Sequence, residues 1–326
     1  MVMSETGKAN SLVMKTGVVM DPIDGIKTYK DSTFAMLLEA QRRGHALYYM
    51  EPGDLFAKDG RVFAGMQQLE VRDNTTDWFS LTPVGSRPLD ELNIVLMRRD
   101  PPFDMDYIYT TYMLELAEKA GTLVINRPQS LRDANEKFFI NSFPQCCVPM
   151  IISSSSSLIR EFVSTQGRCV VKPLDGMGGE SIFQVSDTDM NLNVILETIT
   201  RHNSRPVMAQ KYIDEISQGD KRILVINGEP VPYALARFAS EGDFRGNLAK
   251  GGSSKGVPLS ERDRWICSQV APELKKRGIL FAGLDVIGDW LSEVNVTSPT
   301  GIRELDEEFG LNIAVLLFDS IEEILT

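Results

Sequence analysis

The chain has 326 residues, of which 43% are hydrophobic and 24% are charged, and its formal net charge is −11. This length and composition indicate a folded protein with more than one packed unit, and the negative charge argues against nucleic acid as a partner because it repels phosphate backbones. No run reaches the roughly 18 apolar residues of a membrane span, and residues 1–11 lack the apolar core of a signal peptide, so we expect a cytoplasmic protein without a membrane partner.

The first part of the chain alternates predicted strands and helices. Asp31 can cap a helix, because Phe34 and Leu37 keep helical spacing and Gly44 provides a stop. Apolar runs predict strands at residues 15–22, 46–51, 91–100 and 122–126, and a second helix is expected at 105–121. The alternation predicts a parallel sheet with helices on its faces up to about residue 130, interrupted by a polar insertion at residues 54–90.

The second part of the chain is richer in strands and predicts an α+β arrangement. Ser130 begins a Ser-x-x-Asp pattern, which is typical of a helix start and marks a new unit. The serine run 153–157 predicts a loop before a helix, and Ser260 caps a helix that Pro272 should kink and Gly278 should end. Strands are expected at residues 168–174, 181–186, 207–213, 221–228 and 229–237, the last two as an antiparallel pair around Asn227 and Gly228.

Lys172 precedes a glycine-rich loop that lies between two predicted strands. Gly176, Gly178 and Gly179 allow the backbone to approach a ligand closely and to direct its amides at phosphate oxygens, while the lysine supplies positive charge. The lysine stands before the glycines, unlike the lysine of a Walker A loop. An ordinary glycine-rich hairpin with a surface lysine fits this pattern equally well.

A second cluster lies in the predicted hairpin between residues 284 and 295. If residues 288–290 form a three-residue loop, Asp285 lies directly opposite Glu293, and Asn295 shares their face because strand side chains alternate. Two opposed carboxylates repel each other, and a divalent cation would remove that cost with oxygen ligands of the type that magnesium takes. We favour this metal site over a solvated hairpin whose charges lie too far apart to matter.

Basic residues in the second half could hold an anionic substrate, although most surface arginines are only solvated. The candidates are Arg222, Arg237, Arg245 and Arg303. The segment 241–256 is rich in glycine, serine and charge and has no apolar face. It predicts either a disordered excursion or a mobile lid that orders over a bound nucleotide.

The chemistry that the residue inventory excludes is also informative. The only two histidines, His45 and His202, lie outside these clusters, so we expect no histidine base and no Ser-His-Asp or Cys-His apparatus. The four cysteines have no CxxC spacing and indicate neither a zinc site nor a disulfide framework. Phosphoryl transfer fits this inventory, because its catalysis depends on positioning and charge neutralisation.

Longer strings resemble one known family. VVMDPI near the start, MRRDPPFD at residues 97–104, NRPQSLRDANEK, KPLDGMGG and NVTSPTGIRE are similar to the bacterial glutathione synthetases of the ATP-grasp superfamily. The resemblance covers nearly the whole chain and implies a Rossmann-like parallel α/β domain (pre-ATP-grasp) followed by a two-part α+β ATP-grasp fold. We therefore expect a loose N-terminal tail at 1–13, the pre-ATP-grasp domain at 14–133, a subdomain with the phosphate loop at 134–213, and a C-terminal subdomain at 214–326 with the metal site and a mobile lid at about 240–256.

The resemblance also implies roles for individual residues. The expected catalytic residues are Lys172, Arg222 and Arg237, and the expected ligands of Mg²⁺, for which Mn²⁺ is a possible substitute, are Asp285, Glu293 and Asn295. The expected ATP-binding residues are Lys137, Lys172, Gly176, Met177, Gly178, Gly179, Gln210, Lys211, Tyr212, Ile213 and Asp220. The expected substrate-binding residues are Arg222, Arg237, Arg245, Asn295 and Arg303. Lys211 departs from the neutral residue expected at its position.

The activity implied by the resemblance is an ATP-dependent ligation. It would join γ-glutamylcysteine to glycine through an acyl phosphate, with release of ADP and phosphate, in a homo-oligomer that the family leads us to expect as a tetramer. Two alternatives remain open on sequence alone. One is another ATP-grasp ligase that joins a different acid and amine, and the other is a non-catalytic nucleotide-binding regulator, against which the intact metal-ligand positions argue.

Overall fold

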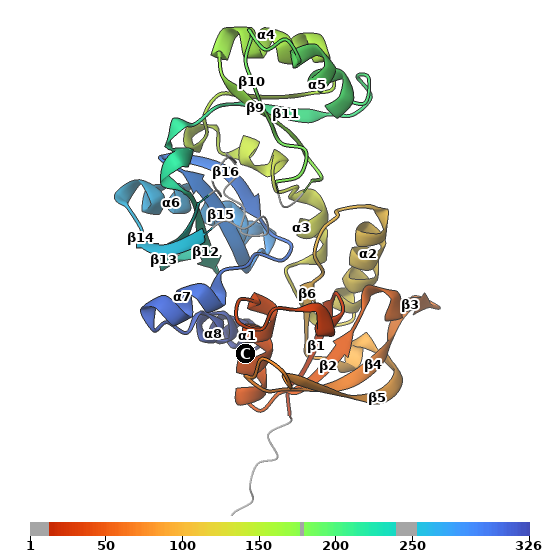
Figure 1. Ribbon diagram of the computed structural model, residues 1–326. Coiled ribbons are helices and arrows are strands. Elements are labelled where there is room, and N and C mark those ends of the chain that lie inside the picture. The colour runs from red at the N-terminus through yellow and green to blue at the C-terminus, as the bar shows by residue number, and fades with distance from the viewer. Residues whose placement is uncertain (1–12, 177–178, 239–252) are drawn as a thin grey trace, which may run out of the picture.

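The computed structural model describes residues 13–176, 179–238 and 253–326, and its strands form three sheets (Figure 1). Residues 1–12 of the predicted tail lie outside these ranges. Within the described residues, no helix combines the length and the apolar composition that a bilayer span requires. Short 3-10 helices connect the larger elements, at Ile23–Gly25, Pro52–Asp54, Leu89–Glu91, Phe138–Ser142, Pro144–Cys146 and Asp214–Gln218.

The N-terminal sheet has the parallel strands that the alternation predicts: β1 (Lys15–Met20), β2 (Ala46–Met50), β6 (Ile94–Arg98) and β7 (Leu123–Ile125). Helices α1 (Ser32–Arg42) and α2 (Met105–Lys119) cover its two faces, since Val18 packs in the hydrophobic cluster of α1 and Val19 in that of α2. The Asp31 side chain accepts a hydrogen bond from the Phe34 amide at 2.7 Å, which confirms the predicted cap.

Residues 54–90 interrupt the alternation, as predicted, but they belong to the sheet. These residues form β3 (Leu55–Lys58), β4 (Arg61–Val71) and β5 (Phe79–Pro88), which extend the sheet in the antiparallel sense through pairing of β4 with β2. In β4 the buried residues Val62, Ala64 and Met66 alternate with more exposed ones. This period-two pattern is the ordinary signature of a half-buried strand.

The middle sheet is antiparallel and has the order β10-β9-β11-β8. Its strands are β8 (Met150–Ser153), β9 (Cys169–Pro173), β10 (Phe183–Val185) and β11 (Val207–Lys211). Helices α4 (Ser156–Gln166) and α5 (Leu192–Ile199) pack on it and share a separate hydrophobic cluster with it. The predicted loop in the serine run is short, because the run also ends β8 and begins α4, whose N-cap is Ser155.

The C-terminal sheet has the order β14-β13-β12-β15-β16. Its strands are β12 (Asp220–Ile226), β13 (Glu229–Phe238), β14 (Ser253–Pro258), β15 (Phe281–Ile287) and β16 (Trp290–Asn295). Helix α6 (Glu261–Arg277) packs on one face, and α7 (Ile302–Phe309) and α8 (Ile313–Leu325) pack on the other. As predicted, Ser260 caps α6 and Gly278 ends it in a left-handed conformation.

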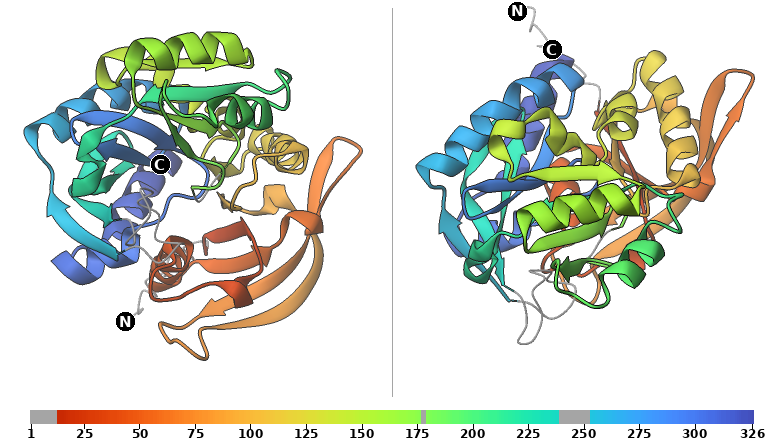
Figure 2. Two further views of the ribbon diagram at one scale, coloured as in Figure 1. Left: turned by 45° about the horizontal axis from the view of Figure 1, so that its top comes forward. Right: turned by 90° about the horizontal axis from the view of Figure 1, so that it is seen from above.

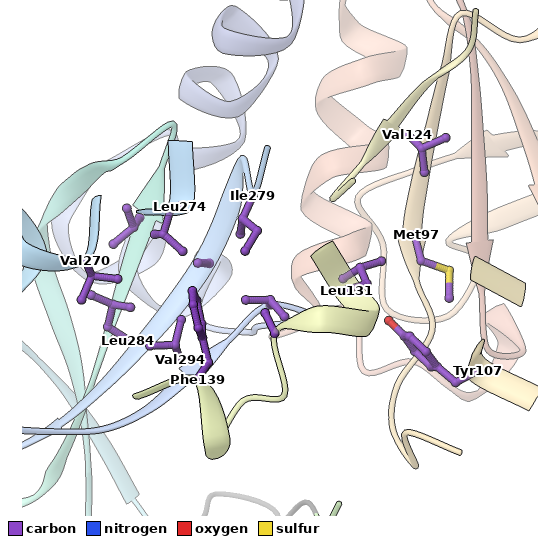
Figure 3. Close-up of a cluster of buried hydrophobic side chains, with 14 of the residues drawn as sticks. Met97, Tyr107, Val124, Leu131, Phe139, Val270, Leu274, Ile279, Leu284 and Val294 are labelled. Carbon is purple, nitrogen blue, oxygen red and sulfur yellow. The ribbon is translucent and has the colours of Figure 1, made fainter. Parts of the chain in front are cut away.

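The hydrophobic core is continuous between the N-terminal and C-terminal sheets. Figure 3 shows Met97 and Tyr107 on one side, Leu131 and Phe139 in the middle, and Leu284 on the other side of a single cluster. The middle sheet has its own cluster and lies apart from the N-terminal sheet, at the top of Figure 1. Met208 of β11 belongs to the larger cluster, with Met150 and Ile152 of β8 packed against it, so the middle sheet also shares apolar contacts with the C-terminal part of the fold.

The predicted helix start at Ser130 is wrong. Helix α3 (Pro128–Asp133) begins two residues earlier, and Ser130 lies inside it, where its hydroxyl donates to the carbonyl of Arg277. Pro128 is the stronger signal, because proline is favoured in the first turn of a helix, where its missing N–H costs nothing.

Candidate functional site

A pocket of about 210 Å³ lies between the middle and C-terminal sheets. Most of the residues singled out from the sequence line it, although they come from separate parts of the chain. These are Lys137, Lys172, Gly176, Gly179, Gln210, Lys211, Tyr212, Ile213, Asp220, Arg222, Arg237, Asp285, Glu293 and Asn295.

Two lysines converge on one carboxylate in this pocket. The Nζ atoms of Lys137 and Lys172 lie 3.5 and 3.6 Å from Oε1 of Glu293. Lys172 stands on β9 of the middle sheet and Glu293 on β16 of the C-terminal sheet, so these contacts connect the two sheets across the pocket. Lys137 Nζ also donates to the carbonyl of Gly176 at 2.6 Å, which fixes the start of the glycine loop beside it.

Burial and charge act in opposite directions on these groups. Burial lowers the pKa of Lys172, despite the nearby Glu293 carboxylate that opposes this change. Burial alone would raise the pKa of Glu293, but Lys137 and Lys172 outweigh it and lower that pKa. The carboxylate is therefore held ionised between the two ammonium groups.

The hairpin of β15 and β16 places Asp285 directly opposite Glu293, as predicted. The predicted three-residue loop is wrong, because Ile287 pairs with Trp290 and only Gly288 and Asp289 form the turn. A register shift between Asp285 and residue 286 restores the expected pairing. Gly288 has a φ of +55°, a left-handed conformation that favours glycine in a two-residue hairpin turn.

Asp285 is neutralised by two arginines on neighbouring strands. Arg222 of β12 donates to both of its carboxylate oxygens, at 2.5 and 2.9 Å, and Arg237 of β13 lies 2.9 Å from Oδ2. These arginines hold the pKa of Asp285 far below its usual range, although burial opposes the change. Gly283 makes room for this pair, because a Cβ there would lie 2.7 Å from Cδ of Arg222.

Two buried polar atoms of the pocket have no hydrogen-bond partner among the described residues, Nε2 of Gln210 and Oδ1 of Asp220. The other oxygen of Asp220 accepts from Arg237 at 2.5 Å, and burial raises the pKa of Asp220 to about 6. Unpaired buried groups are costly, and a polar ligand in the pocket would satisfy both. Apolar side chains of Val170, Ile182 and Ile216 also line the pocket, and Val170 pairs with Gln210 across strands β9 and β11.

Four sequence-predicted site residues remain, of which the structure describes only Arg303. Met177, Gly178 and Arg245 lie outside the described residues. Arg303 is on α7, where its side chain pairs with Asp73 at 2.9 Å in a groove between α1 and α7. Of the predicted lid at 240–256, the described part is residues 253–256, which form the start of β14.

Sequence reasoning missed Glu136, which is partly buried and lines the pocket. Its carboxylate accepts hydrogen bonds from the amides of Val296 and Thr297, at 3.2 and 3.3 Å, and from the Thr297 hydroxyl at 2.8 Å. Its carbonyl accepts from the Val294 amide at 3.0 Å. Glu136 thus holds the end of β16 in place. Its position next to Lys137 is the one local signal for this role.

Other missed lining residues are mostly apolar or lie beside predicted ones: Val170, Glu180, Ile182, Ile216, Ile287 and Ser292. Most of them stand on strands already assigned to the pocket or next to the glycine loop. Period-two alternation along those strands could have identified some of them.

Comparisons with known proteins agree with this arrangement. Residues 14–132 match the family model for the prokaryotic glutathione synthetase N-terminal domain, and residues 136–310 match that for the prokaryotic glutathione synthetase ATP-grasp domain. Among curated relatives, the glutathione synthetase of Pseudomonas aeruginosa is 55% identical over 94% of this chain and 97% of its own length. The glutathione synthetase of Xanthomonas campestris pv. campestris is 56% identical over 94% of this chain and 96% of its own length.

Solved structures share the fold at low sequence identity. The D-cycloserine synthetase DcsG is 14% identical, with a TM-score of 0.67 over 94% of this chain and 99% of that one. D-alanyl-alanine synthetase A from Vibrio cholerae is 14% identical, with a TM-score of 0.61 over 95% of this chain and 98% of that one. The expected ATP-grasp architecture and the resemblance of the long sequence strings are both confirmed. This chain belongs to the prokaryotic glutathione synthetase family of ATP-grasp ligases.

Proposed function

We propose that this chain joins γ-glutamylcysteine to glycine with ATP, and so forms glutathione. The observation that carries the proposal is the meeting of Lys137 and Lys172 with Glu293 in one buried pocket. Relatives that are about 55% identical over almost the whole chain and carry the name glutathione synthetase support the choice of substrates.

In this proposal, the triphosphate of ATP lies against Lys137, Lys172 and the glycine loop that starts at Gly176. Two ammonium groups and the backbone amides of a glycine loop are suited to phosphate oxygens. The adenine base lies along residues 210–213, where apolar side chains and the unpaired amide of Gln210 meet. A flat apolar slot with a few polar groups at its edge is the usual environment of such a ring.

We further propose Asp285, Glu293 and Asn295 as the residues that hold Mg²⁺. Their oxygens fit a hard divalent cation, and all three side chains line the pocket. No group of three histidine, cysteine, aspartate or glutamate side chains in the described part of the chain could hold a metal ion. Asn295 would supply an amide oxygen as the third protein ligand, and phosphate oxygens and water would complete the coordination. When bound, the ion neutralises phosphate charge.

The first chemical step forms an acyl phosphate. A carboxylate oxygen of γ-glutamylcysteine attacks the γ-phosphorus of ATP, the bond from that phosphorus to the bridging oxygen breaks, and ADP leaves with the electron pair. Lys172 stabilises the charge that develops on the transferred group. Arg222 and Arg237, which hold Asp285 and Asp220, lie where they can also orient the reacting carboxylate.

The second step forms the peptide bond. The neutral amine of glycine attacks the acyl carbon, loses a proton, and expels inorganic phosphate as the carbon–oxygen bond breaks. Enclosure of the acyl phosphate in the buried pocket protects it from hydrolysis.

ADP release tests this proposal when γ-glutamylcysteine, glycine and Mg²⁺ are omitted one at a time. We expect ADP release at full rate only with all three present, and glutathione as the product by mass spectrometry. ADP release that ignores γ-glutamylcysteine but responds to another acid, such as D-alanine, would identify a different ATP-grasp ligase. Nucleotide binding without any ADP release would identify a non-catalytic regulator.

A further inference from the structure

A second, smaller cavity lies beside the pocket, and Glu136 and Gly176 line both. In both views of Figure 2, the yellow chain that contains α3 lies between the green middle sheet and the orange N-terminal strands, and this side cavity lies at their junction. Its other lining residues are Pro101 and Phe103 after β6, Leu131, Ala134 and Asn135 in and after α3, Leu174 and Asp175 after β9, and Thr297 after β16.

The side cavity is small. Its volume is about 20 Å³. One water molecule needs roughly 10–15 Å³ measured in this way, so the side cavity has room for one group of the size of a methyl or a thiol. A longer chain does not fit.

The walls of the side cavity are apolar and firmly held. Leu131 and Ala134 are buried in the core that joins the N-terminal and C-terminal sheets, and Phe103 and Leu174 pack against that core. The side-chain amide of Asn135 donates to the carbonyl of Leu174 at 3.0 Å. Close-packed walls of this kind resist expansion, so a small difference in the size of an occupant should have a large effect.

The side cavity lies at the phosphate end of the pocket. Gly176 begins the glycine loop, and its carbonyl accepts a hydrogen bond from Lys137 Nζ at 2.6 Å. Lys137 Nζ is in turn 3.5 Å from Glu293, a proposed metal ligand. Residues 210–213, along which the adenine base is proposed to lie, line the pocket but are not among the described residues of the side cavity. An occupant of the side cavity is therefore close to the reacting groups and not to the base.

We propose that the side cavity binds the side chain of the residue that carries the reacting carboxylate, which in γ-glutamylcysteine is the CH₂–SH group of cysteine. This inference rests on the proposed function. The side chain branches from the carbon next to the carboxyl group, so a carboxylate held for attack on the γ-phosphorus keeps the thiol a few bonds away. The Phe103 ring suits a thiol, because sulfur makes favourable contacts with aromatic rings.

The charges around the side cavity argue against the other parts of the two substrates. No lysine or arginine is found among the described residues that line it, and Glu136 and Asp175 are acidic. The carboxylate of glycine, or that of the γ-glutamyl end, would lose its hydration there without gaining a cation. A short neutral side chain avoids this cost.

A series of dipeptides tests the inference in the wild type, with ADP release as the assay. γ-Glutamyl-α-aminobutyrate replaces the thiol by a methyl group, γ-glutamylalanine lacks that methyl group, and γ-glutamylnorvaline is one methylene longer. We expect kcat/KM for the aminobutyrate dipeptide to stay within about tenfold of that for γ-glutamylcysteine, the most that a sulfur–aromatic contact adds. The alanine and norvaline dipeptides should each fall at least about tenfold below the aminobutyrate dipeptide, because one missing or extra methylene in an apolar pocket changes kcat/KM by about 10–200-fold.

Enlarging the side cavity should change this preference. Leu174→Ala should raise the ratio of kcat/KM for the norvaline dipeptide to kcat/KM for the aminobutyrate dipeptide by about tenfold or more. Phe103→Leu enlarges the side cavity from another wall and should shift the ratio in the same direction. Leu38→Ala is the matched control, because Leu38 is also a partly buried leucine but lines neither the pocket nor the side cavity, and its ratio should equal that of the wild type. Thermal unfolding verifies that each variant is folded.

An unchanged ratio in folded Leu174→Ala and Phe103→Leu would overturn the inference, as would equal wild-type kcat/KM values for the alanine, aminobutyrate and norvaline dipeptides. If glycine occupied the side cavity instead, Leu174→Ala would accept alanine in place of glycine and keep the wild-type ratio for the dipeptides. Failure of the proposed function looks different, because the wild type would then release no ADP with γ-glutamylcysteine.

Discussion

Replacing Lys172 with methionine tests the centre of the proposed mechanism, because Lys172→Met removes the charge and keeps most of the side-chain volume. The Lys172 ammonium lies 3.6 Å from the Glu293 carboxylate, a separation at which two unit charges interact by roughly 4–5 kcal/mol at an effective dielectric of about 20. A phosphoryl group at a similar distance gains a comparable interaction, of which only the part that grows in the transition state accelerates the reaction. Loss of one such stabiliser costs about 10²–10³ in turnover.

Initial rates of ADP release at saturating γ-glutamylcysteine and glycine measure this effect. We expect kcat to fall into that range while the thermal unfolding midpoint changes little, since Lys137 remains 3.5 Å from Glu293 and keeps its charge compensated. Lys276→Met is the control, because the Lys276 side chain is 78% exposed on α6, and its kcat should equal that of the wild type. A folded Lys172→Met protein with kcat within about threefold of the wild type would refute the role assigned to Lys172.

Three further substitutions follow from the contacts described above. Glu136→Gln weakens the three hydrogen bonds that hold Val296 and Thr297. It should therefore lower turnover by about tenfold and raise the Mg²⁺ concentration needed for half-maximal rate. An unchanged Mg²⁺ dependence would contradict this. Burial opposes ionisation of Glu39, but hydrogen bonds from Arg42 and Arg43 outweigh it and lower the pKa of Glu39. The stability that Glu39→Gln removes should therefore be present at pH 7 and be lost as the pH falls through that lowered pKa. Thermal unfolding against pH measures this difference, and a difference that persists in strong acid would be evidence against it. Arg303→Ala should change kcat/KM by less than about threefold, because Arg303 pairs with Asp73 outside the pocket. A larger loss of kcat/KM in the ADP assay would show that Arg303 does bind the substrate.

Local patterns predicted most of the elements but failed where two patterns competed. At Ser130, the capping-box pattern was overruled by Pro128, which begins the helix two residues earlier. At residues 54–90, overall polarity hid the alternation in β4 that buries Val62 and Ala64. In both places a second signal was present in the sequence, and weighing it against the first would have given the observed structure.

The pocket could be predicted only in part. Strand register within a hairpin follows from nearby residues, whereas the packing of one sheet against another depends on residues far apart in the sequence. Asp285 and Glu293 lie eight residues apart in one hairpin, so counting along the hairpin brings them together. The predicted loop length was wrong, but a register shift compensates for it. Lys172 and Glu293 lie on different sheets, and their contact depends on how those sheets pack. Arg303 shows the converse, since positive charge alone did not distinguish a pocket residue from one paired with Asp73.

The structure also changes the reason for expecting a metal ion. From the sequence, the argument for a metal ion was the repulsion between Asp285 and Glu293. In the structure, Arg222 and Arg237 neutralise Asp285. Lys137 and Lys172 neutralise Glu293. The carboxylates are therefore already compensated before any cation binds, and a divalent ion alone would have to compete with these partners.

Nucleotide should consequently be needed for tight metal binding. Phosphate oxygens draw Lys137 and Lys172 away from Glu293 and supply ligands of their own, so the ion then finds both a free carboxylate and additional oxygens. We expect Mn²⁺, used as a spectroscopic substitute for Mg²⁺, to bind about tenfold or more tightly when ADP is present, a difference of at least ~1.4 kcal/mol. Electron paramagnetic resonance of free Mn²⁺ measures this, with ADP and Mn²⁺ alone as the control for binding in solution. Equal affinity with and without ADP would show that the four basic side chains do not compete with the ion, and that Asp285 and Glu293 form a complete metal site by themselves.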